Sequence, residues 1–114
     1  MRYILGIDQS TQGTKAALFD ETGRVAAEGR RKHRQIITAE GYIEHDPAEI
    51  MTQTAAAVRD ALESGGIAPG NVLAIGLCDQ RETVVTWDRR TGKPLPVERQ
   101  RKVGGQAVLG RQLL

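Results

Sequence analysis

The chain has 114 residues, which suffices for one domain with a modest hydrophobic core or for part of one. Its charged fraction of 26% and hydrophobic fraction of 39% are ordinary for globular proteins, so the composition argues against an intrinsically disordered chain and against a membrane protein. Aromatic residues make up 4% of the chain, which is too few for a surface that stacks nucleic-acid bases.

The basic residues are unevenly distributed, although the sequence pI is about 9.0. Residues 1–96 carry 12 Lys and Arg against 13 Asp and Glu, whereas residues 97–114 carry 4 against 1. The main part of the chain is therefore not basic, and we expect no nucleic-acid partner. We interpret residues 97–114 as a divergent basic tail.

Cysteine usage and the N-terminal pattern bear on the compartment. Cys78 is the single cysteine, which excludes an intrachain disulfide and a metal site made of several cysteines. The first apolar run reaches the charge of Asp8 too early for a signal peptide or a membrane span. We therefore expect a cytoplasmic protein with no membrane partner.

The first 28 residues have the pattern of three short strands. The expected strands are Tyr3–Ile7, Thr14–Phe19 and Arg24–Glu28. The first ends at Asp8 and a polar loop over residues 9–13, and the Asp and Gly of residues 20–23 are typical of a tight turn between antiparallel strands. We predict an antiparallel three-stranded meander.

A helix is predicted from about residue 46 to Gly65-Gly66. Asp46 can accept hydrogen bonds from free backbone N–H groups, Pro47 fits the first helical position, and Glu49 has the spacing of a capping box. The glycine pair provides the stop. One face of this helix is expected to be core: Ile50, Met51, Thr54, Ala57, Val58, Ala61 and Leu62.

Three further segments complete the pattern. The apolar run Asn71–Cys78 predicts another buried strand, residues 83–87 are a β-branched stretch typical of strands, and residues 88–92 have the composition of a turn. The basic run at residues 30–34 is interpreted as the solvated end of a strand rather than a binding patch.

A first chemical motif begins at Asp8 and continues through the loop Gln9-Ser10-Thr11-Gln12-Gly13. A carboxylate at a strand end can hold a magnesium ion or its water shell, and a short loop rich in hydroxyl groups and glycine can turn N–H groups and hydroxyls toward phosphate oxygens. Lys15 could add a positive charge for a terminal phosphate. Taken alone, the motif is more often just an acidic residue before a turn.

A second motif, Gln80-Arg81-Glu82, follows the strand expected at residues 71–78. A guanidinium beside a carboxylate at a strand end offers several donors and two acceptor oxygens, which suits a polyhydroxy substrate. The alternative for a bare Arg-Glu pair is a surface ion pair worth about 0–1 kcal/mol.

The two motifs together resemble a known family. The first resembles the first phosphate-binding loop of the actin-like ATPase superfamily, which includes carbohydrate kinases, actin and heat-shock chaperone ATPases. The second, with Gln-Arg-Glu-Thr at 80–83, Trp-Asp at 87–88 and Thr-Gly-Lys-Pro-Leu at 91–95, resembles the N-terminal domain of the FGGY carbohydrate kinase family, and within it the glycerol kinases. The resemblance covers residues 2–95 and disfavours an actin-like or chaperone-like ATPase.

The resemblance implies ATP and Mg²⁺ as cofactors and a polyol or sugar as substrate. Asp8 is then the candidate catalytic and metal-binding residue. The implied nucleotide-binding residues are Thr11, Gln12, Gly13 and Lys15, and the implied substrate-binding residues are Gln80, Arg81 and Glu82. Lys15 stands where glycerol kinases usually have Arg, and Asp79 stands where Asn is more usual. We expect the two motifs to face one crevice.

The implied fold is α/β and ribonuclease H-like, with a mixed sheet, an antiparallel meander and one long helix, forming an incomplete domain over residues 1–96. The family's catalytic base and its second phosphate loop have no counterpart in this chain, so we expect the isolated chain to phosphorylate nothing. Its shortened sheet is expected to leave an unprotected edge, which favours a homo-oligomer.

The C-terminal tail and the function each admit an alternative interpretation. Shifting a back-translation of residues 97–101 by one base permits Trp-Asn-Asp-Arg, close to the Trp-x-Asp-Arg motif with which the family continues. We therefore hypothesise that the tail is an out-of-frame reading of a longer kinase gene, against a natural or designed short C-terminus. The alternative function is a non-catalytic binding or oligomerisation module that retains the kinase fold.

Overall fold

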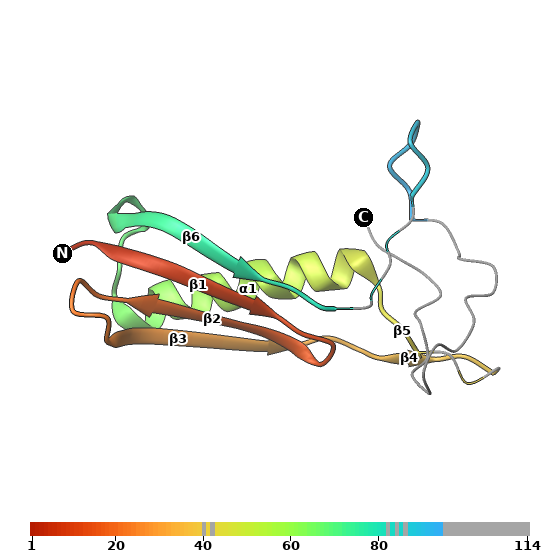
Figure 1. Ribbon diagram of the computed structural model, residues 1–114, viewed down its shortest axis with the longest axis horizontal. Coiled ribbons are helices and arrows are strands. Elements are labelled where there is room, and N and C mark those ends of the chain that lie inside the picture. Colours follow the sequence, from red (N-terminus) through yellow and green to blue (C-terminus); the bar gives the residue numbers. More distant parts are fainter. Residues whose placement is uncertain (40, 42, 82, 84, 86, 95–114) are drawn as a thin grey trace.

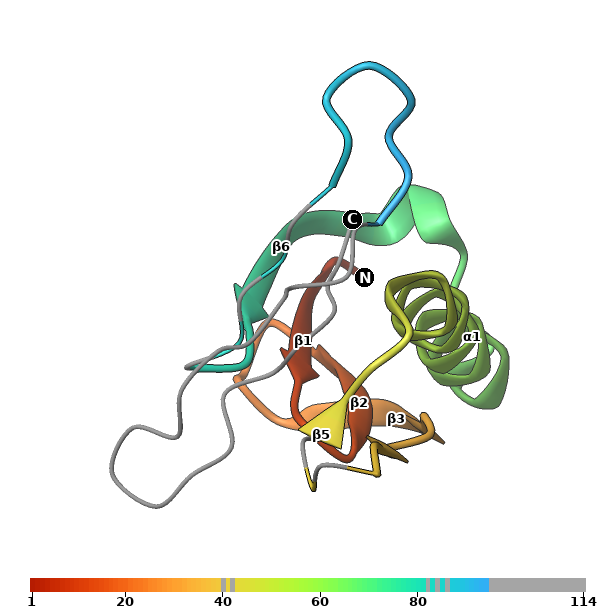
Figure 2. The same cartoon turned by 90° about the vertical axis from the view of Figure 1, so that its right-hand side faces the viewer.

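A computed structural model describes residues 1–39, 41, 43–81, 83, 85 and 87–94 of the chain. A four-stranded sheet with a long helix on one face forms its main body (Figure 1). The sheet contains β1 (Tyr3–Gln9), β2 (Gly13–Phe19), β3 (Val25–Lys32) and β6 (Val72–Cys78) in the order β3-β2-β1-β6. The helix is α1 (Pro47–Gly65), and Figure 2 shows it beside the sheet in end view.

The N-terminal meander predicted from the sequence is confirmed. β1 pairs antiparallel with β2, and β2 pairs antiparallel with β3. At the turn between β2 and β3, the Asp20 carboxylate accepts hydrogen bonds from Thr22 N at 2.8 Å and Arg24 N at 3.1 Å. Gly23 has a φ of 81°, a left-handed conformation that glycine adopts without steric cost.

Strand β6 joins the other side of the meander and makes the sheet mixed. It runs parallel to β1, with Asp8 opposite Cys78. A short 3-10 turn, η1 (Pro69–Asn71), leads into it. Parallel neighbours bring their carboxyl ends to the same edge of a sheet, so the polar residues that follow β1 and β6 become neighbours.

The helix begins and ends as the sequence predicts. The Asp46 carboxylate accepts from Ala48 N at 2.9 Å and Glu49 N at 3.4 Å, which satisfies two N–H groups that the helix leaves free. Gly66 closes the helix in a left-handed conformation, and Ile67 N donates to Leu62 O at 2.9 Å.

Small residues let the helix lie close to the sheet. Ala57 and Ala61 are fully buried, and a β carbon added at Gly29 of β3 would collide with the Ala57 carbonyl. The buried cluster consists of Leu5, Ala16, Leu18, Ala27, Ala57, Ala61 and Ile67. This core lies between α1 and the strands β1, β2 and β3.

Two expectations about α1 are corrected. Met51 was expected in the core but is 58% exposed, because it lies near the first turn of the helix beyond the buried alanines. Glu49 does not act as a capping-box partner in this structure. Its carboxylate instead accepts from Arg34 N at 3.2 Å and Arg34 Nε at 3.0 Å.

The segments between the main elements hold features that the sequence did not reveal. A small antiparallel pair, β4 (Ile36–Ile37) and β5 (Ile43–Glu44), lies between β3 and α1. Thr83 and Val85, the described residues of the β-branched stretch before Trp87, lie outside any strand. The predicted turn at 88–92 is confirmed, with Gly92 N donating to Asp88 O at 2.7 Å.

Within the described residues, no helix is both long and apolar enough to cross a membrane. The proposed tail at 97–114 lies outside the described residues.

Candidate functional site

The carboxyl ends of β1 and β6 border an open hollow of about 460 Å³. The residues that line this strand-end hollow are Asp8, Gln9, Ser10, Thr11, Asp79, Gln80 and Arg81. They come from the two motifs that the sequence singled out, which lie about 70 positions apart along the chain. The parallel pairing of β1 with β6 brings them together.

Asp8 lies on the face of the sheet opposite the helix. Its partners across the sheet are Lys15 in β2 and Cys78 in β6, and residues paired in register point to the same face. The preceding residues on this face are Gly6 and, beside it in β6, Gly76, and a β carbon at Gly76 would meet open space. The ring of Phe19 packs against Gly6, so this face of the sheet is open next to Asp8 only on the β6 side.

The loop that joins β1 to β2 is held by its own polar groups; we call residues 10–13 the first loop. Ser10 donates to the Gly13 carbonyl through its backbone N at 2.8 Å and through its Oγ at 3.0 Å. Gln12 N donates to Ser10 Oγ at 3.3 Å. These bonds give the loop a defined shape before any ligand arrives.

Gly13 has a packing role in this loop. A β carbon at this position would collide with the backbone carbonyl of Arg31 in β3. Glycine is therefore required by the close pairing of β2 with β3, whatever the loop binds. Its neighbour Thr14 is 3% exposed and its Oγ1 lies 3.0 Å from Thr54 Oγ1 of α1, which fixes the start of β2 to the helix.

Gln80 ties the two motifs to each other. Its Nε2 donates to Gln9 Oε1 at 2.9 Å and to the Ser10 carbonyl at 3.1 Å, and its Oε1 accepts from Thr83 Oγ1 at 2.6 Å. The Ser10 carbonyl also accepts from Gln9 Nε2 at 2.8 Å. The amide of Gln80 thus lines the hollow while it bridges β6 to the first loop.

Arg81 and Asp79 give the hollow its charge on the β6 side. Both side chains are exposed and line the hollow together with Asp8. A guanidinium and carboxylates around one polar hollow can bind several hydroxyl groups, since the guanidinium donates and the carboxylates accept. Glu82, the third residue of the predicted substrate motif, lies outside the described residues.

Lys15 has a different partner from the one its predicted role requires. Its Nζ forms an ion pair with Glu28 Oε1 of β3 at 3.1 Å. The pKa of Glu28 lies below its usual range, mainly because Lys15 donates a hydrogen bond to the carboxylate. Desolvation acts in the opposite direction but is the weaker effect. To reach a phosphate, Lys15 would have to exchange this exposed pair for a new one.

A second hollow, of about 370 Å³, lies on the helix side of the same strand ends. Its lining is mostly apolar and includes Ile7, Ile50, Met51, Leu77 and Val85. Gln9, Asp79 and Gln80 line both hollows. The strand ends thus present a polar hollow on one side and an apolar one on the other.

The residues present are compatible with a magnesium ion bound mainly through water. In the described part of the chain, no group of three or more His, Cys, Asp or Glu side chains could hold a metal ion directly. Mg²⁺ usually keeps several waters and takes one or two carboxylates plus phosphate oxygens. Asp8 at the edge of an open hollow fits such a role.

The structure therefore brings four of the predicted site residues to one place: Asp8, Thr11, Gln80 and Arg81 line the strand-end hollow. Gln12 and Gly13 belong to the loop beside it. The sequence analysis missed two residues that support this loop. Gln35 Nε2 donates to the Thr11 carbonyl at 3.0 Å, and His33 N donates to the Gln12 carbonyl at 3.4 Å. No local signal marks Gln35, whose contact crosses 24 positions.

Comparison with known proteins gives a consistent result. The model of the FGGY family of carbohydrate kinases, N-terminal domain, matches residues 3–97. A glycerol kinase of Methylobacterium radiotolerans is 47% identical over 94 residues, which are 82% of this chain and 19% of that protein. Glycerol kinase 2 of Thermotoga maritima is 42% identical over 95 residues, 83% of this chain and 19% of that protein. The chain thus spans about a fifth of the length of the curated relatives it matches.

Solved structures resemble the same part of the chain. The crystal structure of Plasmodium falciparum glycerol kinase with ADP superposes with a TM-score of 0.69 at 41% identity, covering 83% of this chain and 19% of that one. Ligand-bound xylulose kinase from Lactobacillus acidophilus superposes with a TM-score of 0.64 at 28% identity, covering 72% of this chain and 16% of that one.

Proposed function

Because the chain belongs to the FGGY family of carbohydrate kinases, we propose that it is the N-terminal part of an ATP-dependent polyol kinase of the glycerol kinase type. The reaction transfers the terminal phosphate of ATP to a substrate hydroxyl. The observation that carries this proposal is the shared strand-end hollow, where Asp8 of the first motif and Arg81 of the second meet. A reaction that consumes ATP agrees with a cytoplasmic location.

The β6 side of the hollow binds the polyol in this proposal. Arg81 donates hydrogen bonds to the hydroxyl groups, and Glu82 accepts from them. Gln80 was predicted to bind substrate as well. Its amide already bridges Gln9, Ser10 and Thr83, so its contribution is to hold the substrate side against the first loop.

The β1 side of the hollow receives the nucleotide. Thr11, Gln12 and Gly13 of the first loop lie against the phosphates, and Lys15 adds a positive charge once it leaves Glu28. Asp8 would hold Mg²⁺ through its water shell. When bound, this ion would neutralise negative charge on the phosphates; the chain's own residues orient the reactants, which is the main source of catalysis in phosphoryl transfer.

The isolated chain supplies one wall of a kinase cleft and is not a catalyst by itself. This inference is supported by the length of the chain, which is about a fifth of the length of the relatives it matches. We assign residues 1–96 to the kinase part and residues 97–114 to the divergent tail. We expect no detectable phosphorylation of glycerol or sugars. A turnover number within tenfold of ordinary kinases, about 1–100 per second, would refute this expectation.

Binding to each side of the hollow can be tested by following backbone amide signals in NMR spectra. Magnesium-ATP at millimolar concentration should shift the signals of Thr11 and Gln12, and glycerol should shift the signal of Arg81. Asp8→Ala should abolish the first set of shifts and Arg81→Ala the second.

Two control variants remove the same charges elsewhere. Glu63 and Arg59 are exposed residues of α1 outside the strand-end hollow, so Glu63→Ala and Arg59→Ala should both bind like the wild type. The proposal fails if Asp8→Ala and Arg81→Ala bind as well as these controls do.

The exposed strand β6 favours a second property, self-association. Ile75 and Leu77 are 64% and 68% exposed, and β6 is an edge strand of the described sheet. Unpaired edge N–H and C=O groups next to exposed apolar side chains are typical of interfaces between chains. We propose a homo-oligomer formed through this edge. Such an oligomer is also what the alternative function, a non-catalytic oligomerisation module, would require.

A further inference from the structure

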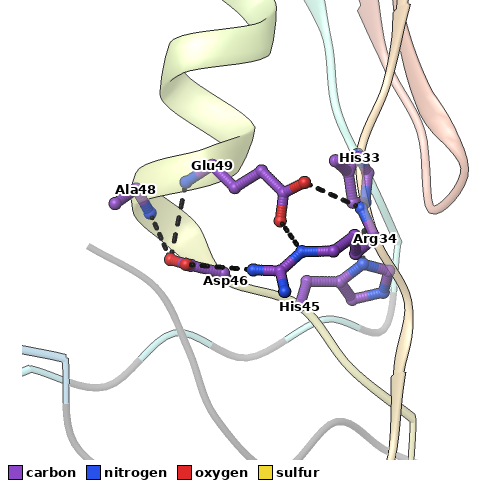
Figure 3. Close-up of polar contacts among 6 residues, drawn as sticks. All are labelled: His33, Arg34, His45, Asp46, Ala48 and Glu49. Carbon is purple, nitrogen blue, oxygen red and sulfur yellow. Dashed lines mark hydrogen bonds and ion pairs between the residues drawn. The ribbon is translucent and has the colours of Figure 1, made fainter.

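Two buried histidines, His33 and His45, form a hydrogen-bonded pair beside the first loop (Figure 3). His33 follows the last residue of β3, and His45 precedes the capping residue of α1. His33 Nε2 lies 2.7 Å from His45 Nδ1, and the rings meet edge to face with centroids 4.8 Å apart. Their residues are 7% and 2% exposed, so water has little access to either ring.

The geometry of the pair favours the neutral form of both rings. A hydrogen bond between two ring nitrogens requires one donor and one acceptor, so the two facing nitrogens share one proton. The other two ring nitrogens, His33 Nδ1 and His45 Nε2, are buried without a hydrogen-bond partner. In the neutral pair, the ring that accepts this bond carries its own proton on its outer nitrogen, and the outer nitrogen of the other ring is bare. A proton added to the bare outer nitrogen would place a positive charge in a buried site, and a second proton between the rings would remove the acceptor of the hydrogen bond.

His33 belongs to the segment, residues 33–35, that donates hydrogen bonds to the backbone of the first loop. The backbone N–H of His33 donates to the Gln12 carbonyl at 3.4 Å. Two residues further, Gln35 Nε2 donates to the Thr11 carbonyl at 3.0 Å. Residues 33–35 therefore hold the loop that lines the strand-end hollow. The bond between His33 and His45 anchors these residues to the start of α1.

Charged groups around the pair are already engaged with each other. Arg34 lies between the histidines in sequence and pairs with Glu49 Oε2 at 3.0 Å and with Asp46 Oδ2 at 4.0 Å (Figure 3). Glu49 on α1 and the Thr11 carbonyl both favour a positive charge on His33. Asp46 bonds the helix N–H groups, so its carboxylate is committed to the cap.

We propose that His33 and His45 are positioning residues for the first loop: the neutral pair holds residues 10–13 in the shape that binds nucleotide phosphates, and protonation of the pair releases them. The phosphate part of this statement rests on the function proposed above. The support of the loop by residues 33–35 does not depend on it.

The direction of the pH effect follows from burial. Desolvation is the largest cause that lowers the pKa of both histidines below 6.5. At His33 it outweighs Glu49 and the Thr11 carbonyl, which both raise the pKa. At His45 the neighbouring His33 lowers the pKa further. A lowered folded-state pKa means that the unfolded chain binds the protons more readily. The contribution of the pair is therefore fully present above about pH 6.5 and is lost as the pH falls from there toward the folded-state values.

The test follows the amide signals of Thr11 and Gln12 from pH 8 to pH 5 together with the ring signals of the histidines. The chain contains only two histidines, so every imidazole signal belongs to the pair. We expect hydrogen exchange at these amides, corrected for its intrinsic pH dependence, to rise at least tenfold as the rings take up protons. The amides of Thr22 and Gly23, in the other tight turn, serve as an internal control and should not respond.

A double variant separates titration from structure. In His33→Gln/His45→Asn, the Gln Nε2 can donate to the Asn Oδ1 in the place of the ring nitrogens, but neither side chain titrates. This variant should keep the first loop protected at every pH. The proposal is overturned if the loop amides of the wild type do not respond to pH, or if they respond equally in the double variant.

The nucleotide arm of the experiment adds magnesium-ATP to both proteins at pH 7.5 and pH 5.5. In the wild type, binding should weaken at least tenfold at the lower pH, and in the double variant it should change less than threefold. A loop that responds to pH in a chain that binds no nucleotide at any pH would refute the proposed function and leave the support of the loop in place. If the double variant does not fold, the wild-type titration alone decides.

Discussion

Leu18 in β2 is fully buried beneath α1, whereas Leu77 in β6 is 68% exposed on the same face of the same sheet. Both residues belong to short apolar strands, and both strands pair with β1. The difference lies in what covers them, because α1 packs on β3 and β2 and barely reaches β1. An apolar strand is thus buried only where a second element lies over it.

The two sides of the candidate site differ in the same way, in how firmly each is attached to the rest of the fold. The first loop is attached to the well-packed half of the sheet through Thr14, Gln35 and His33. The segment after β6 is attached mainly through Gln80. We therefore expect the nucleotide side to be preformed and the substrate side to depend strongly on the bridge that Gln80 makes, which is the side-chain link to the first loop seen among the described residues after β6.

The largest effect is expected from the same truncation made in both regions. Leu18→Ala removes a fully buried side chain and should lower the free energy of unfolding by about 2–5 kcal/mol. Leu77→Ala removes an exposed one and should change it by less than about 0.5 kcal/mol. Urea unfolding followed by circular dichroism measures both. Both measurements are made at concentrations where the chain is monomeric. Equal losses there would show that another part of the same chain covers β6, and the comparison would then fail.

A smaller effect is expected from adding one methyl group at matched glycines. Gly29→Ala would drive a β carbon into the backbone of Ala57 and should cost about 1–3 kcal/mol, because α1 must move away from β3. Gly76→Ala in β6 meets open space and should leave stability unchanged or raise it by about 0.4–1 kcal/mol through the unfolded state. The melting temperatures of the two variants, measured side by side, decide this point.

The sequence predicted best the features whose causes are local. The ends of α1 follow from Asp46, Pro47 and Gly66, which lie within one turn of the groups they satisfy. The meander follows from short apolar runs and a tight turn. Recognition of the family from two separated motifs is confirmed by the matching family model.

Features that depend on distant partners could not be predicted. The prediction that residues 71–78 form a buried strand is wrong in its burial, because Ile75 and Leu77 are 64% and 68% exposed. Their burial depends on where α1 lies, and an apolar run alone carries no such information. Lys15 fits a phosphate ligand by its position, yet its side chain selects Glu28 on the adjacent strand. The pairing of His33 with His45 depends on the fold of the loop between them, for which the sequence has no periodic pattern.

The smallest effect on stability is expected from the substitution that tests self-association. Leu77→Glu places a charge on the exposed face of β6 and should change the free energy of unfolding of the monomer by less than about 0.5 kcal/mol. In sedimentation experiments it should nevertheless shift the chain toward the monomer, because an unpaired charge in an apolar interface is costly.

The matched control for this experiment is Thr52→Glu, which makes the same change in charge at an exposed position of α1. It distinguishes a specific interface on β6 from general repulsion between more acidic chains. If both variants dissociate the oligomer equally, charge alone explains the result and β6 is not the interface. If Leu77→Glu alone dissociates it, the exposed strand that distinguishes the two halves of the sheet is also the surface through which copies of the chain meet.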